Sequence, residues 1–247
     1  MAERAPDRRA VVRVVTYNVR DLLDDRDAVA HVVRACRPDV LCLQEAPRRP
    51  LTAHRLRRLA RESALRWVSG GRASGGTAVL VHPRLDVVEA AAHRLPVTGW
   101  LTRRRGVAAA TVATADGARL TVVSVHLSLR AEERVRHVGR VLERWAAQPG
   151  PLVVAGDLNE LPGGPSWTAL GAQLHDVAAT GAATFPARRP RSRIDAVFVG
   201  PGVEVVGVHV AGASEGLDAD VLTAASDHRP VVVDLRLSGG RVRAIQG

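Results

Sequence analysis

Short apolar runs of strand length alternate with helix-like apolar patterns along almost the whole chain. Residues 12–18 form the first run, and the pattern that follows places Val29, Val32 and Cys36 on one face of a helix that Pro38 ends. A period of two and a period of 3.6 require strands and helices, respectively, that share a buried core. The chain is therefore expected to be a mixed α/β protein from its first residues to its last.

The middle and the end of the chain are rich in strands separated by Gly, Pro and Asp turn signals. The expected strands are 12–18, 39–45, 77–82, 85–91, 106–114, 119–127, 152–155, 194–199, 203–210 and 230–237. Hairpins mixed with helical crossovers suit two mixed sheets packed face to face with helices outside. The predicted architecture is an α/β sandwich.

Two further helices are expected. The first, 51–66, is basic and turns Leu56, Leu59 and Ala60 inward. The second spans 129–147, and its predicted core stripe is Val135, Val138, Val141, Leu142 and Trp145.

The length of 247 residues is compatible with one large sandwich. We predict a polar tail at 1–10, a single domain at 11–238 and a C-terminal tail at 239–247. The sequence shows no signal-peptide pattern and no apolar stretch that suggests membrane insertion, so a cytoplasmic location is expected. Cys36 and Cys42 fall in a helix face and a strand, where they are expected to be ordinary core residues.

The net charge is +10, and every basic residue is arginine because the chain contains no lysine. Arginine binds phosphate bidentately, so a phosphate-bearing substrate is one interpretation. A chain rich in Ala, Val, Arg and Gly is also what a GC-rich genome encodes, so genome composition is an alternative explanation of the arginines. The net charge alone therefore does not decide between a phosphate-bearing substrate and a compositional origin of the arginines.

Polar residues stand where the apolar runs stop. They are Asn18, Glu45, His126, Asp157 with Asn159, and Asp227 with His228. A single carboxylate after a strand is usually a turn former or a helix cap, so the argument rests on the joint pattern.

These segments resemble the endonuclease/exonuclease/phosphatase superfamily, in its characteristic order. The matching motifs are Thr16-Tyr17-Asn18, Leu43-Gln44-Glu45, Val125-His126-Leu127, Gly156-Asp157-Leu158-Asn159, Arg193-Ile194-Asp195 and Ser226-Asp227-His228-Arg229-Pro230. The resemblance implies a four-layered α/β sandwich, in agreement with the periodicity. It also implies a phosphoester hydrolase that uses Mg²⁺ or Mn²⁺.

The resemblance assigns roles to individual residues. Glu45 would bind the metal directly, because a hard cation prefers carboxylate oxygen, and Asp227 would support the same ion. The implied catalytic residues are His126, Asp157, Asn159, Asp195 and His228, and the implied phosphate contacts are Asn18, Asn159 and Arg105. Asp195 would hold His228, but the sequence does not decide whether Asp157 or His228 is the general base.

His126 shares a strand face with Leu120, Val122 and Ser124, so a core histidine is an alternative to a catalytic one. Its Val-His-Leu context resembles the histidine that the deoxyribonuclease I-like and sphingomyelinase-like branches carry near the leaving group. Those deoxyribonuclease I-like enzymes pair it with a carboxylate, yet residues 67–83 contain no Asp or Glu. His126 is therefore expected to contact some other group.

Other features depart from the family pattern or carry weaker signals. Arg20 stands where abasic-site enzymes have an acid, and Phe198 is the only aromatic residue between Asp195 and Asp227, so abasic-site repair is disfavoured. A solvated sheet edge explains 103–105 slightly better than a substrate contact does. The arginines of 188–193 flank Asp195 and are open to either explanation.

The leading hypothesis is a metal-dependent phosphodiester hydrolase whose partner is nucleic acid, DNA or RNA. A small phosphorylated metabolite or an inositol-phosphate-like headgroup is the alternative substrate. A catalytically inactive binding protein that keeps the fold is the alternative from another class, although all the motif residues are present. The oligomeric state is not predicted.

Overall fold

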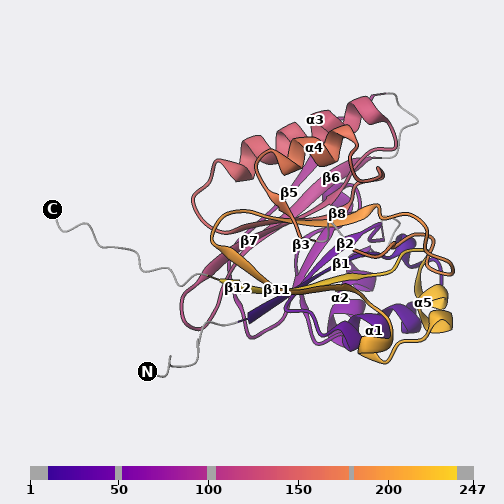
Figure 1. The fold of residues 1–247 in the computed structure, drawn as a ribbon. Helices are drawn as coiled ribbons and strands as arrows, with labels where there is room; N and C mark the ends of the chain where they lie inside the picture. Colours follow the sequence, from indigo (N-terminus) through magenta and orange to yellow (C-terminus); the bar gives the residue numbers. More distant parts are fainter. Residues whose placement is uncertain (1–10, 48–51, 99–103, 178–180, 238–247) are drawn as a thin grey trace, which may run out of the picture.

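The computed structural model describes residues 11–47, 52–98, 104–177 and 181–237, and Figure 1 shows their arrangement. The predicted tails at 1–10 and 239–247, together with residue 238 and Arg103, lie outside the described residues. Within the described part, no helix is both long and apolar enough to cross a membrane.

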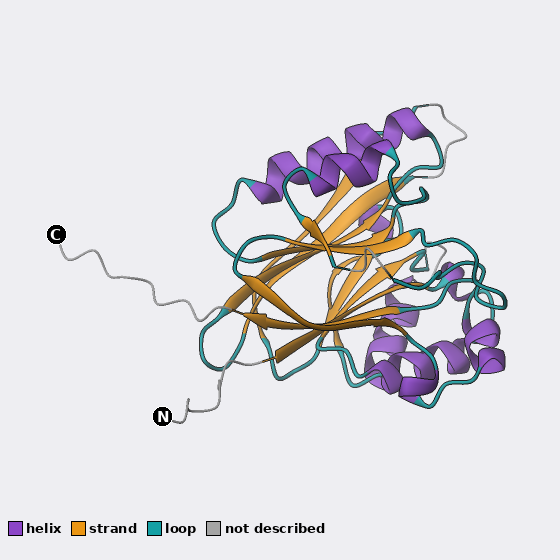
Figure 2. Cartoon of the chain, viewed as in Figure 1, coloured by secondary structure: helices purple, strands orange, loops and turns teal. Residues whose placement is uncertain are grey.

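Two mixed six-stranded sheets form the body of the protein (Figure 2). The first sheet has the order β11 (Val203–Val210), β12 (Val231–Leu237), β1 (Val11–Asn18), β2 (Val40–Gln44), β4 (Ala78–Val81) and β3 (Arg66–Gly70). The second has the order β5 (Asp86–Leu95), β6 (Arg105–Ala113), β7 (Arg119–His126), β8 (Leu152–Asp157), β10 (Asp195–Val199) and β9 (His175–Asp176). The predicted sandwich of two mixed sheets is confirmed.

Helices cover the outer face of each sheet (Figure 1). Those on the first sheet are α1 (Arg26–Cys36), α2 (Thr52–Glu62) and α5 (Ala219–Ala225). Those on the second are α3 (Ala131–Val141), which continues as a π-helical turn at Leu142–Ala146, and α4 (Pro165–Gly171). A third apolar cluster, with residues such as Val14 and Val122, fills the space between the sheets. The molecule thus has four layers.

Strand direction brings the polar strand ends together. β1 is parallel to β2, and β7 is parallel to β8, so the carboxyl ends of each pair meet at one edge of their sheet. β10 and β12 run antiparallel to β8 and β1, respectively, so it is their first residues that reach the same edge. This common edge collects all six motifs.

Two helix boundaries expected from the sequence differ from the structure. The helix expected over 51–66 ends at Glu62, and β3 begins at Arg66 as an extra strand. The helix expected from 129 begins at Ala131. Strand β9 and helices α4 and α5 were not predicted.

The inward face of α3 also differs from the predicted stripe. Val135 is 40% exposed, whereas Glu133 and His137 are fully buried beside Val138 and Val141. Glu133 accepts hydrogen bonds from the backbone and hydroxyl of Thr98 and from Ser128, which is why a charged residue takes the inward position. Cys36 and Cys42 are buried free thiols, as predicted.

Candidate active site

Three of the predicted residues, His126, Asp157 and Asp195, lie side by side. They are the last residues of β7 and β8 and the first residue of β10. In the strand registers, His126 lies opposite Asp157 on one side, and Asp195 lies opposite Asp157 on the other. Asn18, at the end of β1, reaches the same position from the first sheet through a 3.0 Å hydrogen bond to Asp157. The site therefore spans both sheets.

One carboxylate oxygen of Asp157 is the meeting point of the cluster. Its Oδ2 accepts the hydrogen bond from Asn18 Nδ2 and lies 3.5 Å from His126 Nε2 and 3.9 Å from His228 Nε2. Its Oδ1 accepts a 2.8 Å hydrogen bond from the backbone N–H of Asn159. These contacts hold the Asp157 carboxylate from several sides, and the residue is only 1% exposed.

His228 is held by Asp195. The distance from its Nδ1 to Asp195 Oδ2 is 2.9 Å, and the ring packs against Phe185 with the centroids 4.9 Å apart. Thr184 donates a 2.6 Å hydrogen bond to the same Asp195 oxygen. Asp195 Oδ1 is buried without a hydrogen-bond partner, which leaves one carboxylate oxygen available to another ligand.

The charges in the cluster shift two pKa values. Burial raises the pKa of Asp157, and the neighbouring Asp195 carboxylate adds to the effect; His228 partly offsets them, and the pKa is about 6. Burial lowers the pKa of His228, but the Asp195 and Asp157 carboxylates outweigh it and raise the pKa to about 9. Within this pair the proton therefore favours His228 over Asp157.

His126 has a cation as its second neighbour. Arg105 Nη1 lies 3.3 Å from His126 Nδ1. Because a guanidinium only donates, Nδ1 accepts, and the ring proton is on Nε2, which faces Asp157. Arg105 is only 4% exposed, so the expectation of a solvated sheet edge is wrong for this residue.

Asn159 and the two predicted metal ligands lie around this cluster. Asn159 has a left-handed backbone, with φ 49°, and its side-chain amide donates a 3.0 Å hydrogen bond to Leu127 O. Glu45 follows β2, also with a left-handed backbone, and is half-buried. Asp227 lies beside His228 with its carboxylate 38% exposed and 3.6 Å from Arg20 Nε.

A group of three side chains offers ligand atoms close enough to hold one metal ion. These are Asp157, Asp195 and His228, with atoms all within 4.8 Å of one another. Glu45 and Asp227 are not members of this group. The structure brings them to the same edge. The residues predicted as metal ligands are therefore not the ones whose ligand atoms lie within 4.8 Å of one another.

Several supporting residues were not predicted. Gln44 is fully buried and its amide donates to Thr16 and to Ser124, so it links the two sheets beneath the site. Ser226 donates to the backbone oxygen of Asn18, and Thr184 fixes Asp195. Ser226 belongs to a recognised motif, but nothing in the sequence around Thr184 distinguishes it.

Arg193, the member of the 188–193 cluster nearest Asp195, has a structural role. Its guanidinium pairs with Asp176, with Nη2 2.7 Å from Oδ2, and stacks over Trp167 at 4.3 Å from the ring centroid. It is 8% exposed. These contacts join β9 to α4, so Arg193 is not presented to a substrate.

Comparison with known proteins identifies close architectural relatives. The family model described as the endonuclease/exonuclease/phosphatase family matches residues 15–228. No curated protein matches the chain.

Three solved structures illustrate the similarity. The endonuclease/exonuclease/phosphatase from Bacteroides vulgatus is 21% identical with a TM-score of 0.77, covering 92% of this chain and 99% of that one. The mannosyl-6-phosphatase of Bacteroides thetaiotaomicron is 21% identical with a TM-score of 0.73, covering 91% and 99%. TDP2 of D. rerio, in complex with a single-strand DNA product, is 20% identical with a TM-score of 0.72, covering 92% and 99%. At these identities the likeness to the solved structures establishes the fold.

Proposed function

The chain belongs to the endonuclease/exonuclease/phosphatase family, whose members are phosphoester hydrolases, and we propose that this protein is a divalent-metal-dependent phosphodiester hydrolase acting on DNA or RNA. The observation that carries the proposal is the convergence of Asn18, His126 and His228 on one oxygen of Asp157. A buried carboxylate held among hydrogen-bond donors is suited to taking a proton from a water molecule.

The acidic residues at this edge fit a divalent metal ion. Asp157 and Asp195 are buried carboxylates close together, and Asp195 Oδ1 has no hydrogen-bond partner. A hard cation satisfies such oxygens, and we propose that Glu45 and Asp227 hold Mg²⁺ or Mn²⁺ next to this pair. When bound, the ion would neutralise charge on the phosphoryl oxygens.

We assign the general base to Asp157 on geometry. Asn18 and the Asn159 backbone fix its carboxylate, and its burial keeps competing water away. His228 has its Nδ1 engaged by Asp195 and directs Nε2 toward the same space, so it is placed to donate a hydrogen bond to the scissile phosphate. The raised pKa of His228 agrees with the donor role.

The remaining residues are proposed to stabilise the phosphate and the leaving group. Asn18 and Asn159 carry amide donors beside Asp157, and Arg105 adds a buried positive charge. In the reaction, a water oxygen bonds to phosphorus as Asp157 takes its proton, and the P–O bond to the leaving oxygen breaks. The Nε2–H of His126 would donate a hydrogen bond to that oxygen as charge develops on it.

A small phosphorylated substrate is the second candidate, because a mannosyl-6-phosphatase shares the fold along 91% of this chain. The DNA-bound TDP2 neighbour supports the first candidate to a similar extent. A panel of DNA, RNA, p-nitrophenyl phosphate and inositol phosphates, each assayed with metal, separates these substrate classes.

The proposed chemistry is tested with bis-p-nitrophenyl phosphate and added Mg²⁺ or Mn²⁺. Activity should vanish with EDTA. Glu45→Gln and His228→Ala should each lower kcat by about 10²-fold or more, while the exposed-site controls Glu89→Gln and His31→Ala should retain activity. Turnover without metal, or an unaffected Glu45→Gln variant, contradicts the mechanism.

A further inference from the structure

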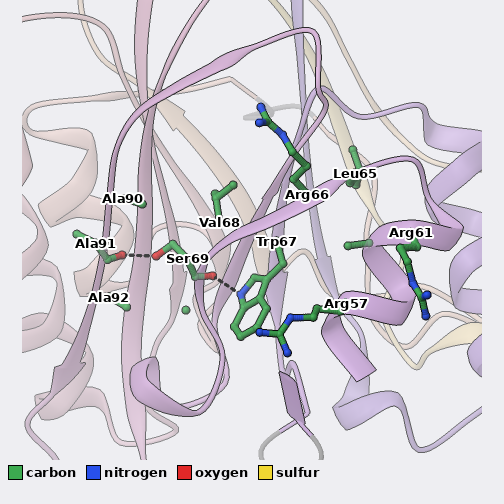
Figure 3. Close-up of a pocket in the computed structure, with 12 residues that line it drawn as sticks. Arg57, Arg61, Leu65, Arg66, Trp67, Val68, Ser69, Ala90, Ala91 and Ala92 are labelled. Atoms are coloured by element: carbon green, nitrogen blue, oxygen red, sulfur yellow. Dashed lines mark hydrogen bonds between the residues drawn. The ribbon is translucent and has the colours of Figure 1, made fainter. Parts of the chain in front are cut away.

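Three arginines line a cavity that is separate from the proposed catalytic cluster. A cavity of about 620 Å³ is bordered by α2, β3 and β5, and its lining includes Arg57, Arg61, Arg66 and Trp67 (Figure 3). No carboxylate is among the residues that line it. We call this feature the arginine groove.

The groove lies where the edge strands of the two sheets meet. β3 is the edge strand of the first sheet and β5 is the edge strand of the second. Ser69 of β3 donates a hydrogen bond to the carbonyl of Ala91, which joins the two edges. The three consecutive alanines at 90–92 leave the floor of the seam without bulky side chains. A chain-like ligand can lie in a recess of this kind.

Two arginines of α2 have no carboxylate partner within the described residues. Arg57 and Arg61 are four residues apart on one helix face, where like charges destabilise a helix. Both are exposed, and within the described residues neither forms an ion pair. Arg58, on the same helix, is different, because it pairs with Glu62 and Asp27. The groove face of α2 is therefore left cationic, as a binding surface for an anion requires.

Trp67 provides a fixed aromatic surface in the same place. Its indole Nε1 donates a 2.9 Å hydrogen bond to Ser69 O, and the guanidinium of Arg57 lies over the ring at 5.7 Å from its centroid (Figure 3). The side chain is half-buried and lines the groove. Arginine beside an exposed aromatic ring is the combination that binds single-stranded nucleic acid, with phosphate on the cation and a base stacked on the ring.

The groove runs toward the catalytic edge. β3 and β2 are both antiparallel to β4, and Ala78 of β4 lies opposite both Gly70 and Leu43. Gly70, which lines the groove, is thus level with Leu43, and Leu43 lies two positions before Glu45. From Gly70 the chain passes to Gly75, where a Cβ would lie 2.7 Å from the carbonyl carbon of Arg105. Arg105 in turn contacts His126.

From these observations we propose that the arginine groove binds a single-stranded segment of the nucleic-acid substrate beyond the scissile phosphate. The inference rests on the proposed function and specifies its substrate class. We favour a strand over a membrane because Trp67 and the arginines line a recess, which a flat lipid surface does not enter. Arg57 and Arg61 would contact phosphates and Trp67 would stack with a base.

The test compares two double variants that remove the same charge. Arg57→Ala/Arg61→Ala alters the groove, and Arg140→Ala/Arg144→Ala alters a second arginine-lined cavity that also contains Glu143. Binding of a fluorescein-labelled 12-nucleotide single strand is measured by anisotropy in EDTA over a range of salt. Thermal unfolding shows that both variants are folded.

The groove variant should bind the strand at least tenfold more weakly than the wild type. Its plot of log K against log salt should be less steep by about 1.4, which is 0.7 for each of two phosphate contacts. The control variant should change affinity less than twofold. An oligonucleotide made of abasic nucleotides should bind the wild type more weakly than the normal strand, because it has no base to stack on Trp67.

Equal losses in the two double variants would overturn the proposal, since binding would then follow net charge alone. Binding to phosphatidylglycerol vesicles without binding to the strand would overturn it as well. Hydrolysis of bis-p-nitrophenyl phosphate by the wild type separates a failure of this inference from a failure of the proposed function. If that activity is present and the groove variant binds like the wild type, this inference fails while the proposed function stands; if it is absent, the proposed function fails first.

Discussion

Two histidines approach the same oxygen of Asp157, but their other neighbours differ. His228 lies between the carboxylates of Asp195 and Asp157, whereas His126 lies between Asp157 and the guanidinium of Arg105. Two carboxylates favour the doubly protonated imidazolium of His228, whereas the guanidinium beside Nδ1 of His126 makes that nitrogen an acceptor and leaves Nε2 as the donor. Residues of one type are therefore prepared for different tasks by their surroundings.

This difference leads to a prediction for His126. An imidazole N–H that donates a hydrogen bond to the leaving oxygen matters most when that oxygen becomes strongly basic. His126→Ala should therefore lower kcat by about 10²-fold or more for a dinucleotide, whose leaving group is an alkoxide. For bis-p-nitrophenyl phosphate, which releases the weakly basic p-nitrophenolate, the loss should be at least tenfold smaller.

The measurement is kcat for both substrates under the same metal and pH, with His31→Ala as an exposed-histidine control. Equal losses for the two leaving groups would show that His126 does not act on the leaving oxygen. It would then belong with the residues that only position Asp157.

The strand-end residues were predictable because polar side chains at the ends of apolar runs have no reason to be there in a core. Arg105 was assigned to the phosphate only through the family resemblance, because nothing in the local sequence distinguishes it from the exposed Arg104 beside it. What selects it is the pairing of β6 with β7, which puts Gly106 opposite His126. Thr184 contacts Asp195 from a connecting segment with no periodic pattern, and such a contact is defined only by the fold.

Among the elements, the parallel pair β7–β8 carries both His126 and Asp157, and its close fit depends on a glycine. A Cβ at Gly156 would lie 1.9 Å from the carbonyl oxygen of Val125 on the neighbouring strand. The two strands would have to separate to accept it, and the proposed catalytic residues one position further along would separate with them.

Gly156→Ala should therefore destabilise the protein by about 3 kcal/mol and reduce activity together with stability. Gly139→Ala is a matched control in the interior of α3, where a Cβ meets nothing within 4 Å, and it should stabilise by about 0.5–1 kcal/mol. Urea unfolding measures both changes. A Gly156→Ala variant as stable as the wild type would contradict the packing argument.

Helix α3 carries a second prediction through Glu133. Burial tends to raise the pKa of this carboxyl, but the hydrogen bonds donated by Ser128 and Thr98 outweigh it and lower the pKa to about 2. A lowered folded-state pKa gives stability that is present above the unfolded value of 4.5 and is lost as pH falls toward 2.

Glu133→Gln should consequently cost about 2 kcal/mol at pH 7, and the cost should shrink steadily below pH 4.5. Urea unfolding at pH 7, 5 and 3.5 measures it, with the exposed Glu143→Gln as a control that should remain within about 0.5 kcal/mol of the wild type. A penalty for Glu133→Gln that does not depend on pH would show that the charge is not what stabilises α3.

Periodicity predicted the long elements and failed where a tertiary contact replaced the rule. Val135 fits the apolar stripe of α3, yet Glu133 takes the inward position because Thr98 and Ser128 supply its donors. Likewise, the helix expected to reach Arg66 ends at Glu62, and β3, which was not predicted, is defined by its pairing with β4. Short elements such as β9 contain too few residues to show any period.

At the scale of the whole molecule, the charge is unevenly divided. The chain has a net charge of +10, yet the edge where the six motifs meet contains Glu45, Asp157, Asp195 and Asp227. The remainder of the protein repels cations and attracts polyanions. Affinity for a divalent ion must therefore come from these few acids, and they are adjacent only in the folded chain.

Metal binding should for this reason stabilise the native state alone. At a Mg²⁺ or Mn²⁺ concentration 100 times Kd, the expected gain is about 2.7 kcal/mol, seen as a higher Tm than in EDTA. Glu45→Gln and Asp227→Asn should each reduce this gain, because each removes a proposed ligand, while Glu89→Gln on the exposed face of β5 should keep it. Differential scanning calorimetry over a metal titration measures the shift without any substrate, so it tests the metal site separately from catalysis. A Tm that rises equally in Glu45→Gln and the wild type would place the ion elsewhere. The residues to mutate next would then be Asp157, Asp195 and His228, because their ligand atoms lie within 4.8 Å of one another.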